Sequence, residues 1–169
     1  MFRWWMMVAC VVVGTPAVYA QGPVRSDIHA GTYSCTDEQV VGFVHPPAKS
    51  AWEAAAFAPA SITLKLEHVE AFERESVLEP GTMLDLSNYS ASVTNERGFE
   101  MACRGSPTSE LIEVANYGWV ECTTAGVDYR FNFITDRYLK AQLSGYATPS
   151  DNATIDTPNI ALGTCQRIE

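Results

Sequence analysis

Val127-Asp128-Tyr129-Arg130-Phe131-Asn132-Phe133 is the stretch that decides the fold, because its odd positions are apolar and its even positions are polar. A period of two is the pattern of a β-strand with one face on a core and the other in water. Residues 119–123 form a second short strand pattern, and Ala125-Gly126 between the two segments suits a tight turn with positive φ. The sequence therefore predicts a β-hairpin.

Strand patterns recur along the whole chain on both sides of this hairpin. The segment that begins at Ile62 alternates cleanly, and its parity slips at His68-Val69, which predicts a bulge or the end of the strand. The expected strands cover residues 31–35, 39–45, 62–67, 83–89, 91–94, 99–103, 111–117, 119–123, 127–133, 138–143 and 160–165, some of which can join into longer ones. This pattern predicts a mainly β domain, an antiparallel β-barrel or sandwich of about eight strands.

One short helix is also predicted. Ser50-Ala51-Trp52-Glu53 has the form of a capping box, so we expect a helix through residues 54–57 that ends before Pro59. The strand at residues 39–45 carries apolar side chains on both faces, which indicates either burial on both sides or an edge that another part covers.

The amino terminus has the features of an export signal. Residues 1–20 hold a basic residue, an apolar run and a Val18-Tyr19-Ala20 ending, which predicts a signal peptide cleaved after Ala20. We expect residues 21–30 to be a flexible leader and residues 31–169 to be one domain. No later run reaches the roughly 20 apolar residues of a membrane span, so the expected location is periplasmic or secreted.

The cysteines fit this compartment. Cleavage removes Cys10 and leaves four cysteines, an even number that is typical of disulfides in an exported chain. Of the three possible pairings we expect Cys35–Cys165 and Cys103–Cys122. No cysteine pair has the two-residue spacing of a zinc knuckle, so no metal is expected.

Charge narrows the classes of partner. The formal net charge is −9, which argues against nucleic acid and anionic membranes and permits a basic protein. Acidic residues gather after the strand at residues 62–67, and we single out Glu70, Glu73 and Glu75 as candidate binding residues, although a solvated loop is the more common explanation of such a cluster. Their spacing fits no calcium loop.

Other candidates have weaker support. His68 and Glu70 are two apart, so on a regular strand they share a face and could ligate a metal or exchange a proton, although a solvated pair at a strand end is the more common arrangement. A cavity for a small apolar ligand could be lined by Trp52, Trp119, Tyr33 and Tyr129, although such aromatic residues more often fill a core. The G-x-S-x-G elbow of serine hydrolases is absent, and we expect no catalytic residues and no cofactor.

The chain resembles small exported proteins of Gram-negative bacteria that have no assigned function, through Tyr33-x-Cys35, Ile62–Leu66, Phe131-Asn-Phe133 and the closing Gly163-Thr-Cys165. It is more faintly similar to bacterial inhibitors of C-type lysozymes, in which an early Y-x-C segment matches Tyr33-Ser34-Cys35. In that likeness Ser144-Gly145-Tyr146 corresponds to the inhibitory loop. The expected function is non-enzymatic binding or an envelope role. Inhibition of a basic lysozyme-type hydrolase and binding of a small ligand are the alternatives.

Overall fold

A computed structural model describes residues 28–46, 51–106, 108–115, 117–143 and 157–169. Within these ranges the chain forms ten strands: β1 (Gly31–Val44), β2 (Glu53–Ala56), β3 (Ser61–Glu75), β4 (Met83–Asn95), β5 (Glu100–Ala102), β6 (Ile112–Ala115), β7 (Trp119–Thr124), β8 (Val127–Asn132), β9 (Arg137–Gln142) and β10 (Asn159–Arg167). The expected signal peptide, most of the leader and Ser144, Gly145 and Tyr146 lie outside the described residues.

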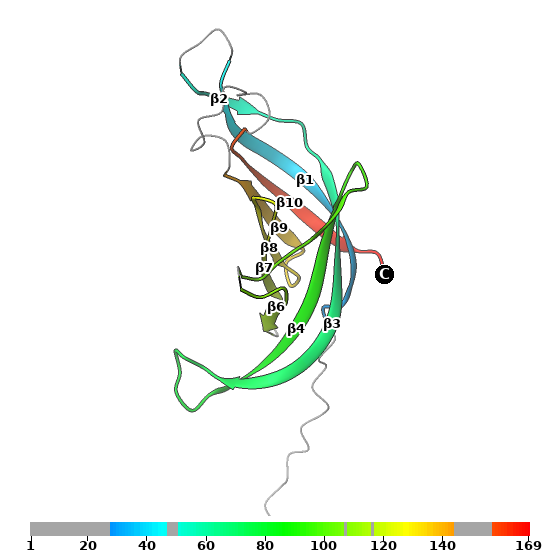
Figure 1. The fold of residues 1–169 in the computed structure, drawn as a ribbon, viewed down its shortest axis with the longest axis vertical. Helices are drawn as coiled ribbons and strands as arrows, with labels where there is room; N and C mark the ends of the chain where they lie inside the picture. Colours follow the sequence, from blue (N-terminus) through cyan, green and yellow to red (C-terminus); the bar gives the residue numbers. More distant parts are fainter. Residues whose placement is uncertain (1–27, 47–50, 107, 116, 144–156) are drawn as a thin grey trace, which may run out of the picture.

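The strands form one antiparallel sheet in the order β5-β4-β3-β1-β10-β9-β8-β7, with β2 paired to β1 and β6 paired to β4. The sheet curls, so that β3 and β4 curve around β6 to β9 (Figure 1). Its two ends approach each other where Arg104, just after β5, exchanges two backbone hydrogen bonds with Thr123 of β7. The sheet is not closed, however, so the structure confirms a mainly β fold but not a barrel or a sandwich.

The predicted hairpin at residues 119–133 is confirmed. Strands β7 and β8 pair from Trp119–Asn132 to Thr124–Val127, and the turn between them has positive φ at both Ala125 and Gly126. Strand β8 also pairs with β9 in the antiparallel direction, and β9 pairs with β10, so the sheet continues from the hairpin to β10.

The predicted helix is wrong. Residues 53–56 form strand β2, and the described part of the chain contains no helix. A helix of about two turns has a costly nucleus and few internal hydrogen bonds. Pairing with residues 41–44 of β1 satisfies the same backbone groups, and Phe57 N–H extends the contact by donating to the carbonyl of Val40.

Two bulges shape the long strands. In β1 the register shifts between Asp37 and Gln39, so Cys35 and Asp37 face the core before the shift and Val40 faces it afterwards. In β3 the shift falls between His68 and Glu70 and leaves Val69 out of the ladder, which confirms the slip predicted there.

The core lies on the concave face of the curled sheet. It includes aliphatic residues of β3 and β4 and the aromatic residues Tyr129, Phe131 and Tyr138 of β8 and β9. Both expected disulfides are present: Cys35–Cys165 joins directly opposite positions of β1 and β10, and Cys103–Cys122 joins the end of β5 to β7. His29, just before β1, is buried and stacks on Phe133.

Candidate binding site

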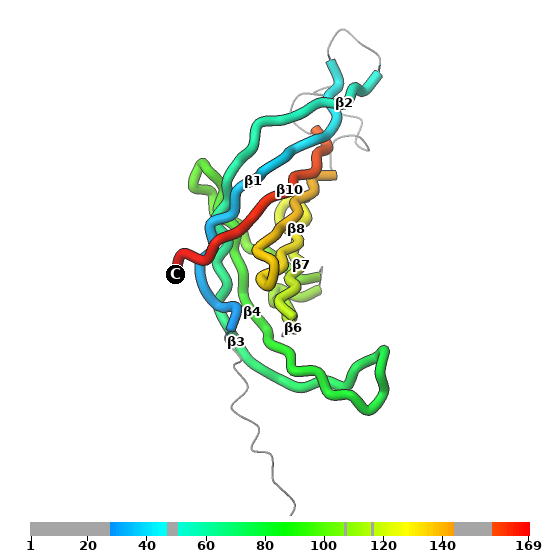
Figure 2. Tube along the Cα trace, turned by 180° about the vertical axis from the view of Figure 1, so that it is seen from behind, coloured from blue at the N-terminus to red at the C-terminus, as the bar shows by residue number. Residues whose placement is uncertain are grey.

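The hairpin of β3 and β4 extends well beyond the rest of the described sheet (Figure 2). Strand β1 pairs with β3 only as far as Leu66, and β6 pairs with β4 only between Leu86 and Tyr89. From Glu73 and Asp85 outward the ladder therefore has two strands. We call residues 73–85 the projecting hairpin.

The apex of the projecting hairpin is apolar and exposed. Val77 and Leu78 are 89% and 92% exposed, the highest values among the large apolar residues described. Adjacent apolar side chains that bury almost nothing in their own fold indicate a contact with something else. The sequence carries a signal for this pair that our predictions missed, because Val-Leu stands in a turn between Glu75 and Pro80.

Hydrogen bonds hold the apex in one shape. Ser76 N–H donates to the carbonyl of Thr82 at 2.8 Å, and Thr82 N–H donates to the carbonyl of Glu79 at 3.0 Å. The Ser76 hydroxyl accepts from Glu79 N–H, and the Glu75 carboxylate accepts from Gly81 N–H. A turn tied in this way loses little conformational freedom when it binds.

The three glutamates that the sequence singled out all lie on β3, not in a loop, but they do not share one face. Glu73 and Glu75 lie opposite Asp85 and Met83, whereas Glu70 lies opposite Asn88 and accepts a hydrogen bond from its side-chain amide at 2.8 Å. Residues 85 and 88 point to opposite faces of β4. The structure thus brings Glu73 and Glu75 together with Asp85 and places Glu70 on the other side.

The one basic residue of the projecting hairpin is already engaged. The guanidinium of Arg74 makes two parallel contacts with the carboxylate of Glu113 in β6, at 2.7 and 2.5 Å. This ion pair connects the projecting hairpin to strand β6. It leaves the negative charge of Glu73, Glu75 and Glu79 near the apex without compensation from Arg74.

His68 and Glu70 do not form the pair considered from the sequence. The bulge at Val69 places His68 opposite Tyr89, with ring centroids 5.5 Å apart, and Glu70 opposite Asn88. Cross-strand partners share a face. The bulge therefore puts the imidazole and the carboxylate on opposite faces of the sheet.

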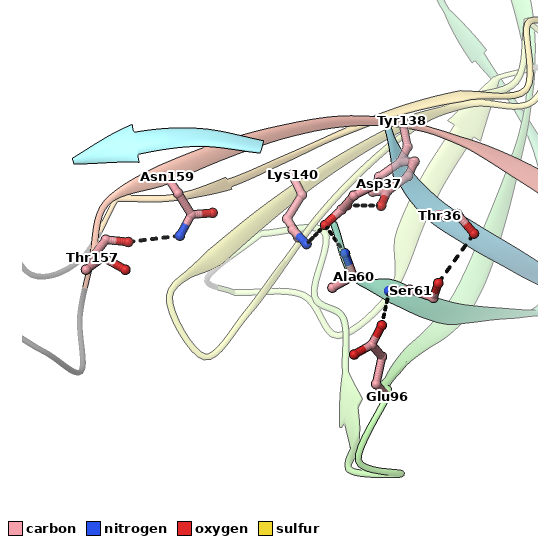
Figure 3. Close-up of polar contacts among 9 residues, drawn as sticks. All are labelled: Thr36, Asp37, Ala60, Ser61, Glu96, Tyr138, Lys140, Thr157 and Asn159. Atoms are coloured by element: carbon pink, nitrogen blue, oxygen red, sulfur yellow. Dashed lines mark hydrogen bonds and ion pairs between the residues drawn. The ribbon is translucent and has the colours of Figure 1, made fainter. Parts of the chain in front are cut away.

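A buried polar cluster lies elsewhere, where β1 faces β9 across β10 (Figure 3). Asp37 accepts hydrogen bonds from the Tyr138 hydroxyl, from Lys140 Nζ at 2.8 Å and from Ala60 N–H at 3.1 Å. Burial, followed by the hydrogen bond to Asp37, raises the pKa of the Tyr138 hydroxyl well above its usual range. Tyr138 therefore stays a proton donor, and the cluster ties three segments together.

The four aromatic residues considered as a cavity lining are not brought together. Tyr33 and Tyr129 are core residues. Trp119 points to the opposite face of β7 from the buried Val120 and Cys122, and its indole donates to Glu121. Trp52 precedes β2 and packs against His45.

Two other features, a metal-binding cluster and a membrane-spanning helix, are absent from the described residues. No group of three or more His, Cys, Asp or Glu side chains is arranged to hold a metal ion within the described ranges. The same part of the chain has no helix that is long and apolar enough to cross a membrane. No protein-family model, curated protein or solved structure matches the chain.

Proposed function

We propose that the protein is a non-enzymatic binding protein of the cell envelope, exported to the periplasm or beyond, that inserts its projecting hairpin into a partner protein. The observation that carries this proposal is the exposure of Val77 and Leu78 on a hydrogen-bonded apex. Burying each of these side chains contributes about 1.5–3 kcal/mol. An apolar recess in the partner is the matching surface.

The charge around the apex gives the chemistry of the partner. Glu73 and Glu75 lie on β3, Asp85 faces Glu73 across the ladder, and Glu79 lies in the apex. An anionic lipid surface repels this arrangement. A protein with basic residues around an apolar recess attracts it, so we assign a basic protein as the partner.

A photo-crosslinking residue tests this assignment in cells that produce the protein. The probe replaces Leu78 in one variant and Gln166, an exposed residue of β10, in the control. We expect the probe at position 78 to give one discrete adduct with a basic protein and the probe at position 166 to give no adduct with that protein. Adducts with lipid alone, or equal adducts at both positions, contradict the proposal.

The purified partner then allows a matched test of the charges. Glu73→Gln with Glu75→Gln should weaken binding and reduce its dependence on salt, because both carboxylates flank the apex. Glu70→Gln is the control, since Glu70 lies on the other face and is bonded to Asn88. Equal losses from both changes contradict the proposed orientation.

Inhibition of a basic lysozyme-type hydrolase is the second candidate, and the acidic flanks of an apolar projection favour it. Enzyme assays with a C-type lysozyme should show saturable inhibition that is lost on Val77→Asp with Leu78→Asp. Replacing Ser144, Gly145 and Tyr146, the residues of the suspected inhibitory loop, tests the alternative route. Full inhibition after both sets of changes excludes this candidate.

A further inference from the structure

The face of β1, β10 and β9 that points away from the core is unusually apolar, and Trp119 of β7 lies beyond the polar outward-facing residues of β8. We call this surface the outer face and define it by Val41, Phe43, Trp119, Leu139, Ile160 and Leu162. Five of these side chains are 40–52% exposed, and Leu139 is half-buried. A one-sided antiparallel sheet normally carries polar residues at such positions.

The register makes the apolar residues of β1, β10 and β9 one continuous patch. Val41, Ile160 and Ala141 follow one another across three strands, and Gln39, Leu162 and Leu139 form the next row on the same face. Neighbouring strands lie about 4.8 Å apart, so the side chains are in contact range. The apolar surface continues past Phe43 into an open hollow of about 540 Å³ that Ala54 and Ala56 also line.

We propose that the outer face is the interface of a homodimer, in which two copies pack sheet against sheet. A two-fold contact places the same surface of each copy against itself, so a strongly acidic face would repel its partner. The charged side chains that point outward from these five strands are nearly balanced: Glu38, Glu121 and Asp128 against Arg130 and Arg137. The whole chain carries a net charge of −9.

The area of the outer face suits a dimer. Lengths of about 30 Å for β1 and β10 and about 20 Å for the six-residue β7, β8 and β9, at about 4.8 Å spacing, give a face of roughly 580 Å² per copy. Two copies then bury about 1,150 Å², at the lower end of the range for a specific protein–protein interface. A small apolar ligand in the hollow beside Phe43 would leave Leu139 and Leu162 exposed.

If the outer face is the dimer interface, charged substitutions on it should dissociate the dimer and lower the mass of the protein in solution. We would measure sedimentation of the mature, disulfide-bonded protein from low to high micromolar concentration. We expect the wild type to approach twice the mass of the chain. Leu162→Lys, which buries one unpaired charge per copy, should raise the dimer dissociation constant at least about 100-fold. Leu139→Lys is the second variant, and circular dichroism checks that both remain folded.

Val77→Lys is the matched control, because it makes the same kind of change at the apex of the projecting hairpin. It should leave the dimer intact, so loss of partner binding and loss of dimerisation are seen separately. A monomeric wild type at high micromolar concentration overturns the proposal. Dissociation by Val77→Lys but not by Leu162→Lys, or a monomer that carries the added mass of a small ligand, also overturns it.

Discussion

The hydroxyl of Tyr138 donates a hydrogen bond to the carboxylate of Asp37, although the two residues lie 101 positions apart and on strands that are not neighbours. Strand β10 runs between them, and its residue in the same row is Gly163. The absence of a side chain at Gly163 lets the Tyr138 ring reach across β10. This relationship links three strands and makes the cluster around Asp37 sensitive to mutation.

Loss of Lys140 should destabilise the fold strongly. Lys140 Nζ contacts Asp37, whose side chain is almost fully buried, so Lys140→Met leaves a carboxylate without its counter-charge. We expect a loss of about 3 kcal/mol or more in the free energy of unfolding, measured with urea. Tyr138→Phe removes only a neutral donor and should cost about 1–3 kcal/mol.

Lys65→Met is the control for this prediction. Lys65 pairs with Glu67 at 2.6 Å, but both side chains are exposed, so the change should stay within about 0.5 kcal/mol. Equal effects at positions 65 and 140 would show that the cluster around Asp37 does not act as a buried pair.

Gly163→Ala should be among the most damaging small changes in the chain. A Cβ at this position would lie 2.2 Å from the carbonyl oxygen of Thr36 and 2.4 Å from the Tyr138 ring. Neither atom can move without breaking the ladder or the contact with Asp37, so we expect a loss of about 3 kcal/mol in urea unfolding. Gly98→Ala, at a φ of +77° with open space around it, should cost only about 1–2 kcal/mol.

The two disulfides should contribute unequally to stability. Cys35–Cys165 spans 130 residues and Cys103–Cys122 spans 19. In the chain-entropy model these closures contribute about 5 and about 3 kcal/mol. Replacing each pair with alanine and measuring the free energy of unfolding tests the order. A larger loss for the shorter closure would show that local packing around β5 and β7 outweighs loop entropy.

Alkaline pH should unfold the protein through its core tyrosines. Burial raises the pKa values of Tyr33, Tyr129 and Tyr138, so the unfolded chain releases these protons first. The stability is therefore fully present below about pH 10 and falls above it, by up to about 1.4 kcal/mol per pH unit for each tyrosine. Urea unfolding at successive pH values measures this slope.

Tyr129→Phe tests the source of that slope. It removes one of the three titrating groups, so the decline of the free energy of unfolding with pH should become shallower. Tyrosinate absorbance should rise together with unfolding. Ionisation of all three hydroxyls in a protein that remains folded would contradict this account.

Local sequence patterns predicted the parts of the fold that depend on neighbours in the chain. The alternation of apolar and polar residues at Val127–Phe133 and Ile62–Glu67 correctly predicted strands. The change in that alternation at His68-Val69 correctly predicted the bulge. The capping box that begins at Ser50 wrongly predicted a helix. A capping box is a local signal, whereas β2 forms by pairing with β1, which the local sequence does not show.

The candidate site was predicted only in part for the same reason. Glu73 and Glu75 were identified, but the bulge that separates their face from that of Glu70 depends on the pairing with β4. Nothing in the spacing of Asp37 and Tyr138 indicates that β10 brings them together. The apolar residues Val41 and Phe43 were expected to be covered, yet they are about half exposed in the single chain.

The ion pair between Arg74 and Glu113 should control the order of the projecting hairpin more than the stability of the fold. Both side chains are partly exposed, so Arg74→Met should lower the free energy of unfolding by no more than about 1 kcal/mol. It also frees the two-stranded ladder from β6. Hydrogen exchange of the amides in residues 73–85 should therefore become faster, while exchange in β8 and β9 stays unchanged.

A double-mutant cycle with Glu113→Gln isolates this contact. If the pair acts as a tie, the double variant should exchange no faster than Arg74→Met alone, because the contact is already lost. A looser hairpin must be ordered again on binding. The same variants should therefore weaken partner binding, mainly by lowering the association rate constant. Faster exchange with unchanged binding would show that the partner contacts the apex without needing a preformed hairpin.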